Sequence, residues 1–423
     1  MQTNTSLEPQ GRAPPSAKEW VLTALVSVIW IGLATVVFSK ASGDDLASVY
    51  LAAVFHGLDR PDLIYDHHPE HFSDILSDEW REQGVARGHK TPDLLHPYVQ
   101  PPLWSALLAP IALSLSFPAF QMIALAIANT CLVLCALVAW RLWRPDASPV
   151  KHMILSLVLL SFSWPYFTSM LLGQIQPVVT LLMLLALERA AAGRPGQGGL
   201  ALATAAALKV SPAALGLYWL ATGQWRAAGW AAVWGIAWLG LMVAIVDWAL
   251  IEAFLDRLQG MSGQVVLGTM NISLPVALYW MTDPAPLDYT IRVAPAWFGP
   301  LTGILLVALM LIAANAERRA DPARERLIGL PIALLGSLVL APLAWAHYFT
   351  IAVLFLPALP RLIGRRWGLA VGSVAWLLVS APLALLCAGE DTVPRTATVY
   401  ALLPLSGVLI IMGAGLTARL KTR

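Results

Sequence analysis

Two adjacent carboxylates stand where the first long apolar segment of the chain ends. Asp44 and Asp45 follow the apolar run 20–38 and begin the stretch Asp-Asp-Leu-Ala-Ser-Val-Tyr. A carboxylate at the mouth of a membrane cavity can act as a general base, taking a proton from a sugar hydroxyl as that hydroxyl attacks. Solvated carboxylates are also favoured in the first turn of a helix, where free backbone amides attract negative charge. The residue types alone leave both interpretations open.

Two further ionisable residues lie in apolar surroundings. Lys209 stands within the apolar run 197–222, shortly before Pro212. A lysine at membrane depth is costly and indicates a function, here contact with a phosphate, unless its long side chain reaches the membrane surface. His347 lies in the stretch Pro-Leu-Ala-Trp-Ala-His-Tyr, outside any charged loop. It is either a second site residue or a hydrogen-bonded histidine at the interface.

Three polar residues accompany the ends of apolar runs. Gln174 follows Gly173 between two such runs, where it either contributes to a site or only marks a turn. Tyr98 and Gln100 precede two prolines, which are well tolerated at the start of a helix. This placement puts Tyr98 and Gln100 at the same membrane interface as Asp45.

Six of the eight histidines fall between residues 42 and 100. His67, His68 and His71 stand near Asp66 and Glu70, a composition that raises the question of a metal site. Their spacing matches no established metal-binding motif, and a polar surface loop explains them equally well. We therefore predict no metal site.

The composition places the chain in a membrane. It has 423 residues, of which 58% are hydrophobic and 12% charged, with a mean hydropathy of +0.68. A soluble domain carries about 25% charged residues. These values exclude a soluble enzyme, a disordered chain and a fibrous repeat. A net charge of +2 also leaves no electrostatic footprint for nucleic acid.

Apolar segments predict an all-α polytopic integral membrane protein with about 12 transmembrane helices. A single membrane domain at 19–418 is expected between a disordered cytoplasmic tail at 1–18 and a basic cytoplasmic tail at 419–423. Two stretches, 42–100 with a net charge of −7 and 249–292, are expected to stay outside the bilayer and to carry short surface helices. The candidate crossings are 20–38, 100–116, 118–141, 152–171, 175–188, 197–222, 226–248, 293–315, 327–343, 346–360, 367–388 and 396–417.

Basic residues in short loops predict the orientation, because such loops stay in the cytoplasm. Arginines cluster at 318–326 and 361–366, so 42–100, 249–292 and the turn at His347 are expected on the extracytoplasmic face of the cell membrane. The basic loop at 141–151 falls outside under a simple count of crossings. Either a segment between 99 and 222 is re-entrant or one crossing is miscounted, and both remain open.

An ordered set of motifs resembles glycosyltransferase family 87, and the resemblance covers about residues 20–417. Members of this family are similar to polyprenyl-phosphate-mannose-dependent α-1,2-mannosyltransferases with the membrane-embedded GT-C fold. The motifs are Asp-Leu-x-x-x-Tyr-x-Ala-Ala from Asp45, Leu-Ile-Tyr65-Asp66, Tyr98-x-x-Pro-Pro, Leu-Leu-Gly173-Gln174, Lys209-x-x-Pro212, Asn271-x-Ser273-Leu274 and Pro342-Leu-Ala-Trp345-x-His347.

The resemblance implies roles for individual residues. Asp45 takes the position of the family's base, with Asp44 as the alternative. His347 matches the first histidine of a Pro-x-Ser-Trp-x-His-His pattern, in which Tyr348 replaces the second. Asn271 keeps its place in an Asn-Gln-Ser-Leu pattern. The residues expected to bind the phosphate and sugar of the donor are Lys209, His347, Gln174, Asn271, Tyr98 and Gln100.

The resemblance also implies the substrates. A polyprenyl-phosphate sugar is the expected donor, with mannose the expected hexose, and a lipid or glycan on the extracytoplasmic side is the expected acceptor. No cofactor is expected. The sequence contains no glycine-rich phosphate loop and no stretch typical of a nucleotide-binding domain.

The alternatives are two other classes of membrane protein. A polytopic transporter of a small or lipid-linked molecule would show an internal repeat with matching broken helices, and the acidic stretch 42–100 has no counterpart in the second half. A scaffolding protein would have no use for Lys209 or for paired carboxylates at the interface. The sequence therefore favours a glycosyltransferase.

Overall fold

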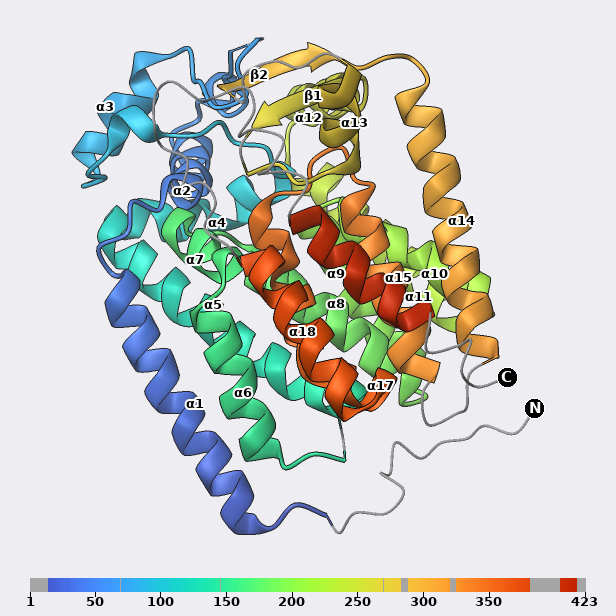
Figure 1. Ribbon diagram of the computed structural model, residues 1–423. Helices are drawn as coiled ribbons and strands as arrows, with labels where there is room; N and C mark the ends of the chain where they lie inside the picture. The colour runs from blue at the N-terminus through green and yellow to red at the C-terminus, as the bar shows by residue number, and fades with distance from the viewer. Residues whose placement is uncertain are drawn as a thin grey trace, which may run out of the picture.

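The protein is a helical bundle with a small mixed cap at one end (Figure 1). The structure is a computed structural model that describes residues 14–68, 70–144, 146–268, 270–282, 288–319, 325–380 and 404–416. The predicted basic tail at 419–423 and most of the predicted N-terminal tail lie outside the described residues. So do parts of the expected crossings 367–388 and 396–417.

Most elements belong to the bundle, and a few form the cap. The bundle helices are α1 (Ala17–Phe38), α4 (Leu103–Ser114), α5 (Phe117–Trp143), α6 (Pro149–Ser161), α7 (Trp164–Leu172), α8 (Gln176–Ala191), α9 (Pro195–Leu208), α10 (Leu215–Thr222), α11 (Trp225–Ile245), α14 (Phe298–Arg318), α15 (Glu325–Val339), α16 (Thr350–Phe355), α17 (Leu359–Ile363), α18 (Arg365–Ser380) and a last helix at Pro404–Leu416. The cap and its root hold α2 (Asp44–Gly57), α3 (Asp78–Ala86), α12 (Trp248–Ser262), β1 (Gln264–Gly268), α13 (Leu274–Thr282) and β2 (Asp288–Val293). Short 3-10 turns are η1 (Pro61–Leu63), η2 (Pro92–Leu94), η3 (Ser211–Ala214), η4 (Ala346–Phe349) and η5 (Leu356–Ala358).

Several described helices can cross a membrane. Five are long and apolar enough by length and composition, or six if the pair α6 and α7, bent by 69°, counts as one span. That pair occupies the expected crossing 152–171, inside the region 99–222 where the sequence allows a re-entrant segment. Others are short, such as the 12-residue α4. A polytopic membrane protein is thus confirmed, whereas the number of about 12 crossings stays a prediction.

The expected crossing 197–222 is broken in the middle. Helix α9 ends at Leu208, Lys209 is extended, and the chain resumes with η3 and α10. Pro212 in η3 has no backbone N–H for a continuous helix, which explains the break. The indole of Trp104 donates a hydrogen bond of 2.6 Å to the carbonyl of Ala207 at the broken end. The break therefore leaves Lys209 in an irregular segment beside other protein groups.

The prediction of an all-α fold needs one correction. Strands β1 and β2 form a two-stranded antiparallel sheet within the predicted extracytoplasmic stretch 249–292 and its edge. Branched residues such as Val265, Val266 and Ile291 favour extended backbone, which the mixed composition of this stretch obscured. The expected short helices are present as α12 and α13.

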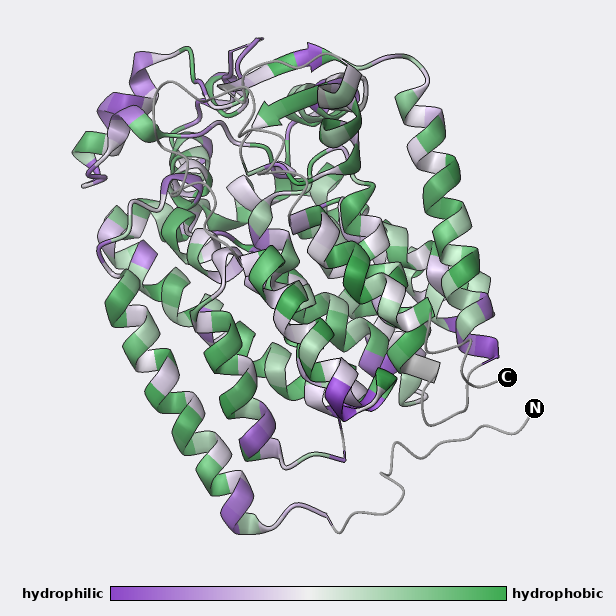
Figure 2. Cartoon of the chain, viewed as in Figure 1, coloured by the Kyte–Doolittle hydropathy of each residue, from purple (hydrophilic) through white to green (hydrophobic). Residues whose placement is uncertain are grey.

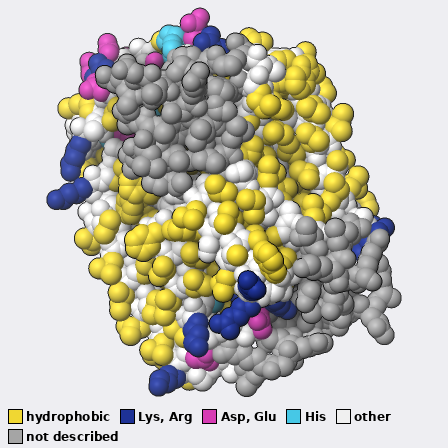
Figure 3. Space-filling model, viewed as in Figure 1, with side chains coloured by type: hydrophobic (Ala, Val, Ile, Leu, Met, Phe, Trp, Pro, Cys, Tyr) yellow, Lys and Arg dark blue, Asp and Glu magenta, His cyan; other side chains and the backbone are white. Residues whose placement is uncertain are grey.

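Polarity is distributed as a membrane requires. Figure 2 shows hydrophobic residues along the middle of the bundle. Hydrophilic residues lie in α3, in β2 and at those ends of α1, α6 and α14 that lie away from the cap. On the face shown in Figure 3, hydrophobic side chains form a broad belt and charged ones gather at its two ends. This pattern fits a bundle whose middle contacts lipid and whose two ends contact water.

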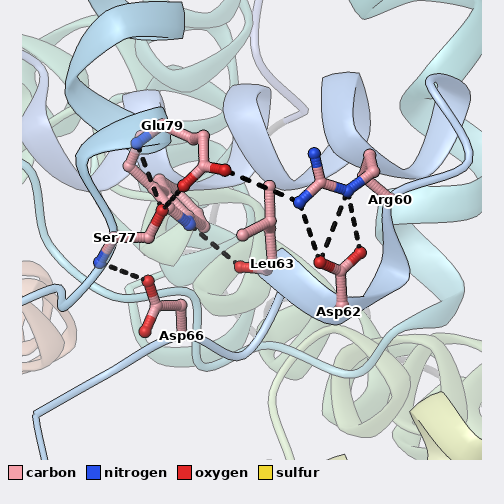
Figure 4. Close-up of polar contacts among 7 residues, drawn as sticks. Arg60, Asp62, Leu63, Asp66, Ser77 and Glu79 are labelled. Carbon is pink, nitrogen blue, oxygen red and sulfur yellow. Dashed lines mark hydrogen bonds and ion pairs between the residues drawn. The ribbon is translucent and has the colours of Figure 1, made fainter.

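The acidic stretch 42–100 folds through its own polar contacts (Figure 4). Arg60 pairs with Asp62 at 2.9 Å and with Glu79 at 3.7 Å. The hydroxyl of Ser77 bonds to Glu79, and its backbone N–H donates to Asp66 at 2.6 Å. The segment therefore forms an ordered cover over the end of the bundle from which α2 rises.

Candidate active site

A cavity of about 410 Å³ lies beneath this cover. Its walls come from the start of α2, the segment before α4, the turn between α7 and α8, the break after α9 and the turn at η4. The cavity brings together most of the residues predicted from the sequence. These are Asp44, Asp45, Gln100, Gln174, Lys209 and His347.

Two glycines let the wall elements meet. Gly43 precedes α2 and Gly173 ends α7, both with a φ of +67°, a conformation that glycine adopts without strain. The N–H of Gly43 donates to the carbonyl of Leu171 at 2.9 Å. A Cβ on Gly173 would lie 2.6 Å from the Cβ of Leu46. The close approach places the first turn of α2 directly beside Gln174.

Asp45 is the carboxylate that opens into the cavity. Its side chain is 21% exposed. One oxygen bonds to Nδ1 of His96, and the other accepts from the amide nitrogen of Gln174. Burial disfavours a charged His96, but the charge of Asp45 and its hydrogen bond outweigh burial, so the pKa of His96 lies above its ordinary value. Both partners thus orient Asp45.

Asp44 is buried in a network of its own. It is 5% exposed and accepts hydrogen bonds from Ser42 at 2.5 Å and Thr91 at 3.1 Å. Nε2 of His89 lies 3.6 Å away, and burial lowers the pKa of this histidine despite the nearby charge of Asp44. Asp44 therefore ties the segment around residue 90 to α2, whereas Asp45 is available to a ligand.

Lys209 faces the same cavity without an acidic partner. Its Nζ donates to Oε1 of Gln176 at 3.3 Å and lies 3.9 Å from the centre of the Tyr348 ring. Among the residues that the structure describes, no carboxylate lies within 4.0 Å of this ammonium group. Amide and aromatic contacts hold the cation but do not neutralise it. An anionic ligand in the cavity would meet a positioned positive charge.

His347 lies next to this lysine on the cavity wall. It is 2% exposed, and its ring packs edge-on against Tyr348 at 4.9 Å. Within the described part of the chain, neither ring nitrogen has a hydrogen-bond partner. A buried imidazole of this kind usually satisfies both nitrogens, so the open ones point to a ligand that completes them.

Tyr98 and Asn271 were also predicted as donor-binding residues, but the cavity wall does not include them. The hydroxyl of Tyr98 donates to the carbonyl of Pro101 at 2.9 Å. The amide of Asn271 donates to Val266 at 3.1 Å and accepts from the N–H of Ala344 at 3.0 Å. Both side chains serve the backbone of wall segments, and their donor-binding role stays a prediction.

Other wall residues were not predicted as site residues, although Trp345 belongs to one of the family motifs. His96 stood among six clustered histidines, and only its contact with Asp45 distinguishes it. Phe72, Tyr289 and Trp345 line the outer part of the cavity. Aromatic residues are common at membrane interfaces, so their number carried no signal of a site.

The histidines near residue 70 have local roles. Nδ1 of His67 bonds to the carbonyl of Tyr65 at 2.8 Å, and Nδ1 of His68 accepts from the N–H of Glu70 at 3.1 Å. Among the described residues, no group of three or more His, Cys, Asp or Glu side chains is arranged to hold a metal ion. These histidines shape the cover.

A second, apolar cavity of about 700 Å³ has lining residues that are sequence neighbours of residues lining the first. Small residues of α9 and α11 line much of it, including Ala203, Gly229 and Gly235. At two points, consecutive residues line different cavities. Lys209 and Gln100 line the polar cavity, while the next residues, Val210 and Pro101, line the apolar one. One ligand with a polar head and an apolar tail would fit across this boundary.

Comparisons with known proteins identify the family of the chain. The sequence profile of glycosyltransferase family 87 matches residues 98–342. A polyprenol-phosphate-mannose-dependent alpha-(1-2)-phosphatidylinositol pentamannoside mannosyltransferase of Mycolicibacterium smegmatis is 28% identical over 217 residues, which are 49% of this chain and 50% of the relative. The chain thus spans about half the length of this curated relative. The family match includes Lys209 and Gln174 but ends before His347 and begins after Asp45. With more than half of its residues matched, this membrane protein belongs to glycosyltransferase family 87.

Proposed function

We propose that this glycosyltransferase moves a hexose, with mannose as the sugar, from polyprenyl phosphate to an acceptor hydroxyl on the extracytoplasmic side of the cell membrane. The observation that carries the proposal is the position of Asp45. This carboxylate is held by two side chains and opens into a cavity that also contains an unpaired ammonium group. A base and a cation are the two groups that this transfer requires.

The chemistry follows from these two groups. Asp45 takes the proton of the acceptor hydroxyl, whose oxygen forms a bond to C1 of the sugar. The bond between C1 and the phosphate oxygen breaks, and its electron pair leaves with polyprenyl phosphate. The leaving phosphate gains one negative charge, which the ammonium group of Lys209 stabilises. The open nitrogens of His347 lie beside Lys209 and can contact the same phosphate or the sugar.

The surroundings of the two carboxylates favour Asp45 over Asp44 as the base. A base must come within hydrogen-bond reach of the proton that it takes. Asp44 already accepts from two hydroxyl groups and is nearly inaccessible. Asp45 is more exposed, and its partners are a histidine and an amide that keep it oriented.

The apolar cavity supports a lipid-linked donor. A polyprenyl chain cannot leave the bilayer without a large hydrophobic penalty, so its reactive phosphate must be met at the membrane boundary. Val210, the residue that follows Lys209, lines the apolar cavity. A donor whose tail occupied that cavity would place its phosphate beside the ammonium group and its sugar towards Asp45.

The proposal includes a fold and an orientation. We infer a GT-C-type bundle of about twelve crossings, with 42–100 and 249–292 outside the cytoplasm. Single cysteines introduced by Ser73→Cys and Arg365→Cys should react with an impermeant reagent from opposite sides of sealed vesicles. Reaction of both from the same side would reject the orientation.

Transfer from radiolabelled polyprenyl-phosphate mannose in proteoliposomes tests the function itself. Membrane lipid extracts supply the acceptor, and labelled product should form with the wild-type chain but not with Asp45→Asn. The matched control is Asp62→Asn, which removes an exposed carboxylate of the cover whose one ion-pair partner among the described residues is Arg60. If the wild-type chain transfers labelled sugar neither to an acceptor nor to water, the proposal is contradicted.

A further inference from the structure

We propose that Tyr348 is a positioning residue of the donor site. The face of its ring holds the ammonium group of Lys209 where the leaving phosphate gains charge. This inference rests on the proposed function and adds to it a residue that acts through Lys209. The ammonium nitrogen lies 3.9 Å from the centre of the ring, and both residues line the polar cavity.

The ring of Tyr348 is fixed by its surroundings. Tyr348 is 5% exposed and belongs to η4, which packs against α7, α8 and α15. Its N–H donates to the carbonyl of Trp345 at 2.8 Å, and the N–H of Ala346 donates to the carbonyl of Met270 at 2.8 Å. The ring of His347 lies 4.9 Å away at an angle of 68°. A side chain packed in this way keeps its orientation before any ligand binds.

The side chain of Lys209 needs such support. A lysine has a flexible four-carbon stem, and ordering it costs free energy. Lys209 follows the end of α9 with extended backbone. Its ammonium group contacts the ring of Tyr348 and donates to Oε1 of Gln176 at 3.3 Å. Gln176 is itself oriented by a bond of 3.3 Å to the hydroxyl of Thr180. Two oriented groups therefore hold the end of a flexible side chain.

Both of these groups are neutral, so the charge of Lys209 remains available to a phosphate. A carboxylate in contact with the ammonium group would offset that charge. The face of an aromatic ring attracts a cation through its quadrupole, and the attraction is stronger where water is excluded. The family pattern has a second histidine at the position of Tyr348. An imidazole can become charged near neutral pH, whereas a phenol stays neutral there.

The position of the ammonium group affects both binding and transfer. The leaving phosphate gains one negative charge as its bond to C1 breaks, so its contact with Lys209 strengthens in the transition state. Without the ring, the lysine side chain is free to take other rotamers. Part of the free energy of donor binding is then used to order it again. Loss of the ring should therefore weaken binding and slow transfer.

Binding of polyprenyl phosphate to the full chain in nanodiscs measures this contact without requiring transfer. Tyr348→Leu removes the ring face and should raise the Kd roughly tenfold, which corresponds to about 1.4 kcal/mol. Tyr348→Phe keeps the ring face, so its Kd should stay within about twofold of the wild-type value. The matched control is Phe349→Leu, because Phe349 is a buried aromatic residue of the same turn and lines neither of the two cavities described above. If Tyr348→Leu does not fold, Tyr348→Met replaces it.

A double-mutant cycle shows whether Tyr348 acts through Lys209. In the Lys209→Met chain no ammonium group remains over the ring. Adding Tyr348→Leu to that chain should therefore raise the Kd by less than about twofold. The same loss with and without Lys209 would mean that the ring acts on the phosphate or on the fold directly, which would overturn the inference.

The outcomes separate this inference from the proposed function. If the wild type transfers mannose and Tyr348→Leu binds polyprenyl phosphate as tightly as Phe349→Leu, the positioning role is rejected and the function stands. A loss in Tyr348→Phe as large as in Tyr348→Leu would also reject the role of the ring face. If the loss in Tyr348→Leu depends on Lys209 but no mannose is transferred, the positioning role stands and the proposed function fails. A wild-type chain that does not bind polyprenyl phosphate would reject both.

Discussion

Two charged residues at opposite ends of the bundle, Glu188 and Lys209, differ in how they are partnered. At the end of the bundle away from the cavity, Glu188 is fully buried and pairs with Arg141 at 2.8 Å and with Arg189. Nearby, Asp146 lies 3.4 Å from Arg144 and 3.6 Å from Arg361. These cations are partnered by carboxylates of the chain itself, and they join α5, α8 and α17.

At the cavity end, the inner cation has no such partner. Lys209 rests on an amide oxygen and an aromatic ring, and His347 beside it has two open nitrogens among the described residues. Removing a charge from water costs free energy that only an opposite charge or hydrogen bonds offset. We therefore interpret the paired Glu188 as a structural joint and the unpaired Lys209 as a contact for a ligand.

Replacing the base should produce the largest effect. Asp45→Asn removes the proton acceptor while keeping its size, and a positioned base contributes about 10² to 10⁴ in rate. We expect transfer to fall by this factor with donor binding near normal. Asp44→Asn should lower the rate less and the stability more, because Asp44 accepts buried hydrogen bonds. Initial rates and thermal melts of both variants distinguish these roles. If Asp44→Asn is inactive and Asp45→Asn is active, Asp44 is the base instead.

Removing the unpaired cation should weaken the donor complex. Lys209→Met should raise the Kd for polyprenyl phosphate by about 10- to 100-fold, the usual value of a charge-assisted contact. The fold should be as stable as before or more so, since no carboxylate of the described chain loses a partner. Direct binding of polyprenyl phosphate checks this, with Lys151→Met at the opposite end as control. Unchanged affinity would mean that Lys209 does not contact the phosphate.

Removing the paired carboxylate of Glu188 should lower the stability of the fold and leave transfer unchanged. Glu188→Gln leaves Arg141 and Arg189 without their buried partner. We expect a loss of about 3 kcal/mol in stability, at the low end for a broken buried pair because Arg141 keeps contact with solvent. Transfer by the folded fraction should stay at the wild-type rate. A rate defect without a change in melting temperature would remove the distinction between the two ends.

The smallest effect concerns pH. The pKa of His96 is raised in the folded protein, so the pair with Asp45 stabilises the fold fully below the unfolded pKa of His96. That contribution is lost as the pH rises through the higher folded pKa. The difference in melting temperature between the wild type and His96→Gln should therefore shrink with rising pH. A difference that stays constant from about pH 5.5 to 8.5 would show that His96 is not charged beside Asp45.

How much of the site could be predicted depended on how unusual each residue was for its surroundings. Asp45, Lys209 and Gln174 stood out because charged and amide groups are costly near lipid, and the structure places all three on one cavity. Asn271 was predicted from a family motif instead, and its side chain holds the backbone near Ala344. A polar residue in an apolar sequence is a good candidate for a functional or structural role, but only its contacts in the structure show which of the two it has.

The fold, too, could be predicted only in part. Long apolar runs such as 20–38 and 118–141 became single helices, α1 and α5, with nearly the expected bounds. The sheet and the bulge at Tyr289 could not be foreseen, because they depend on pairing between β1 and β2 and on contact with Phe72. Such long-range contacts produce no periodic pattern in the sequence.

A structure of the Asp45→Asn variant bound to polyprenyl-phosphate mannose would test the central claim most directly. We expect the lipid tail in the apolar cavity, the phosphate within about 3.5 Å of Nζ of Lys209, and C1 of the mannose open towards the side chain at position 45. A donor bound with its phosphate away from Lys209, or with its sugar outside the cavity that Asp45 lines, would contradict the account.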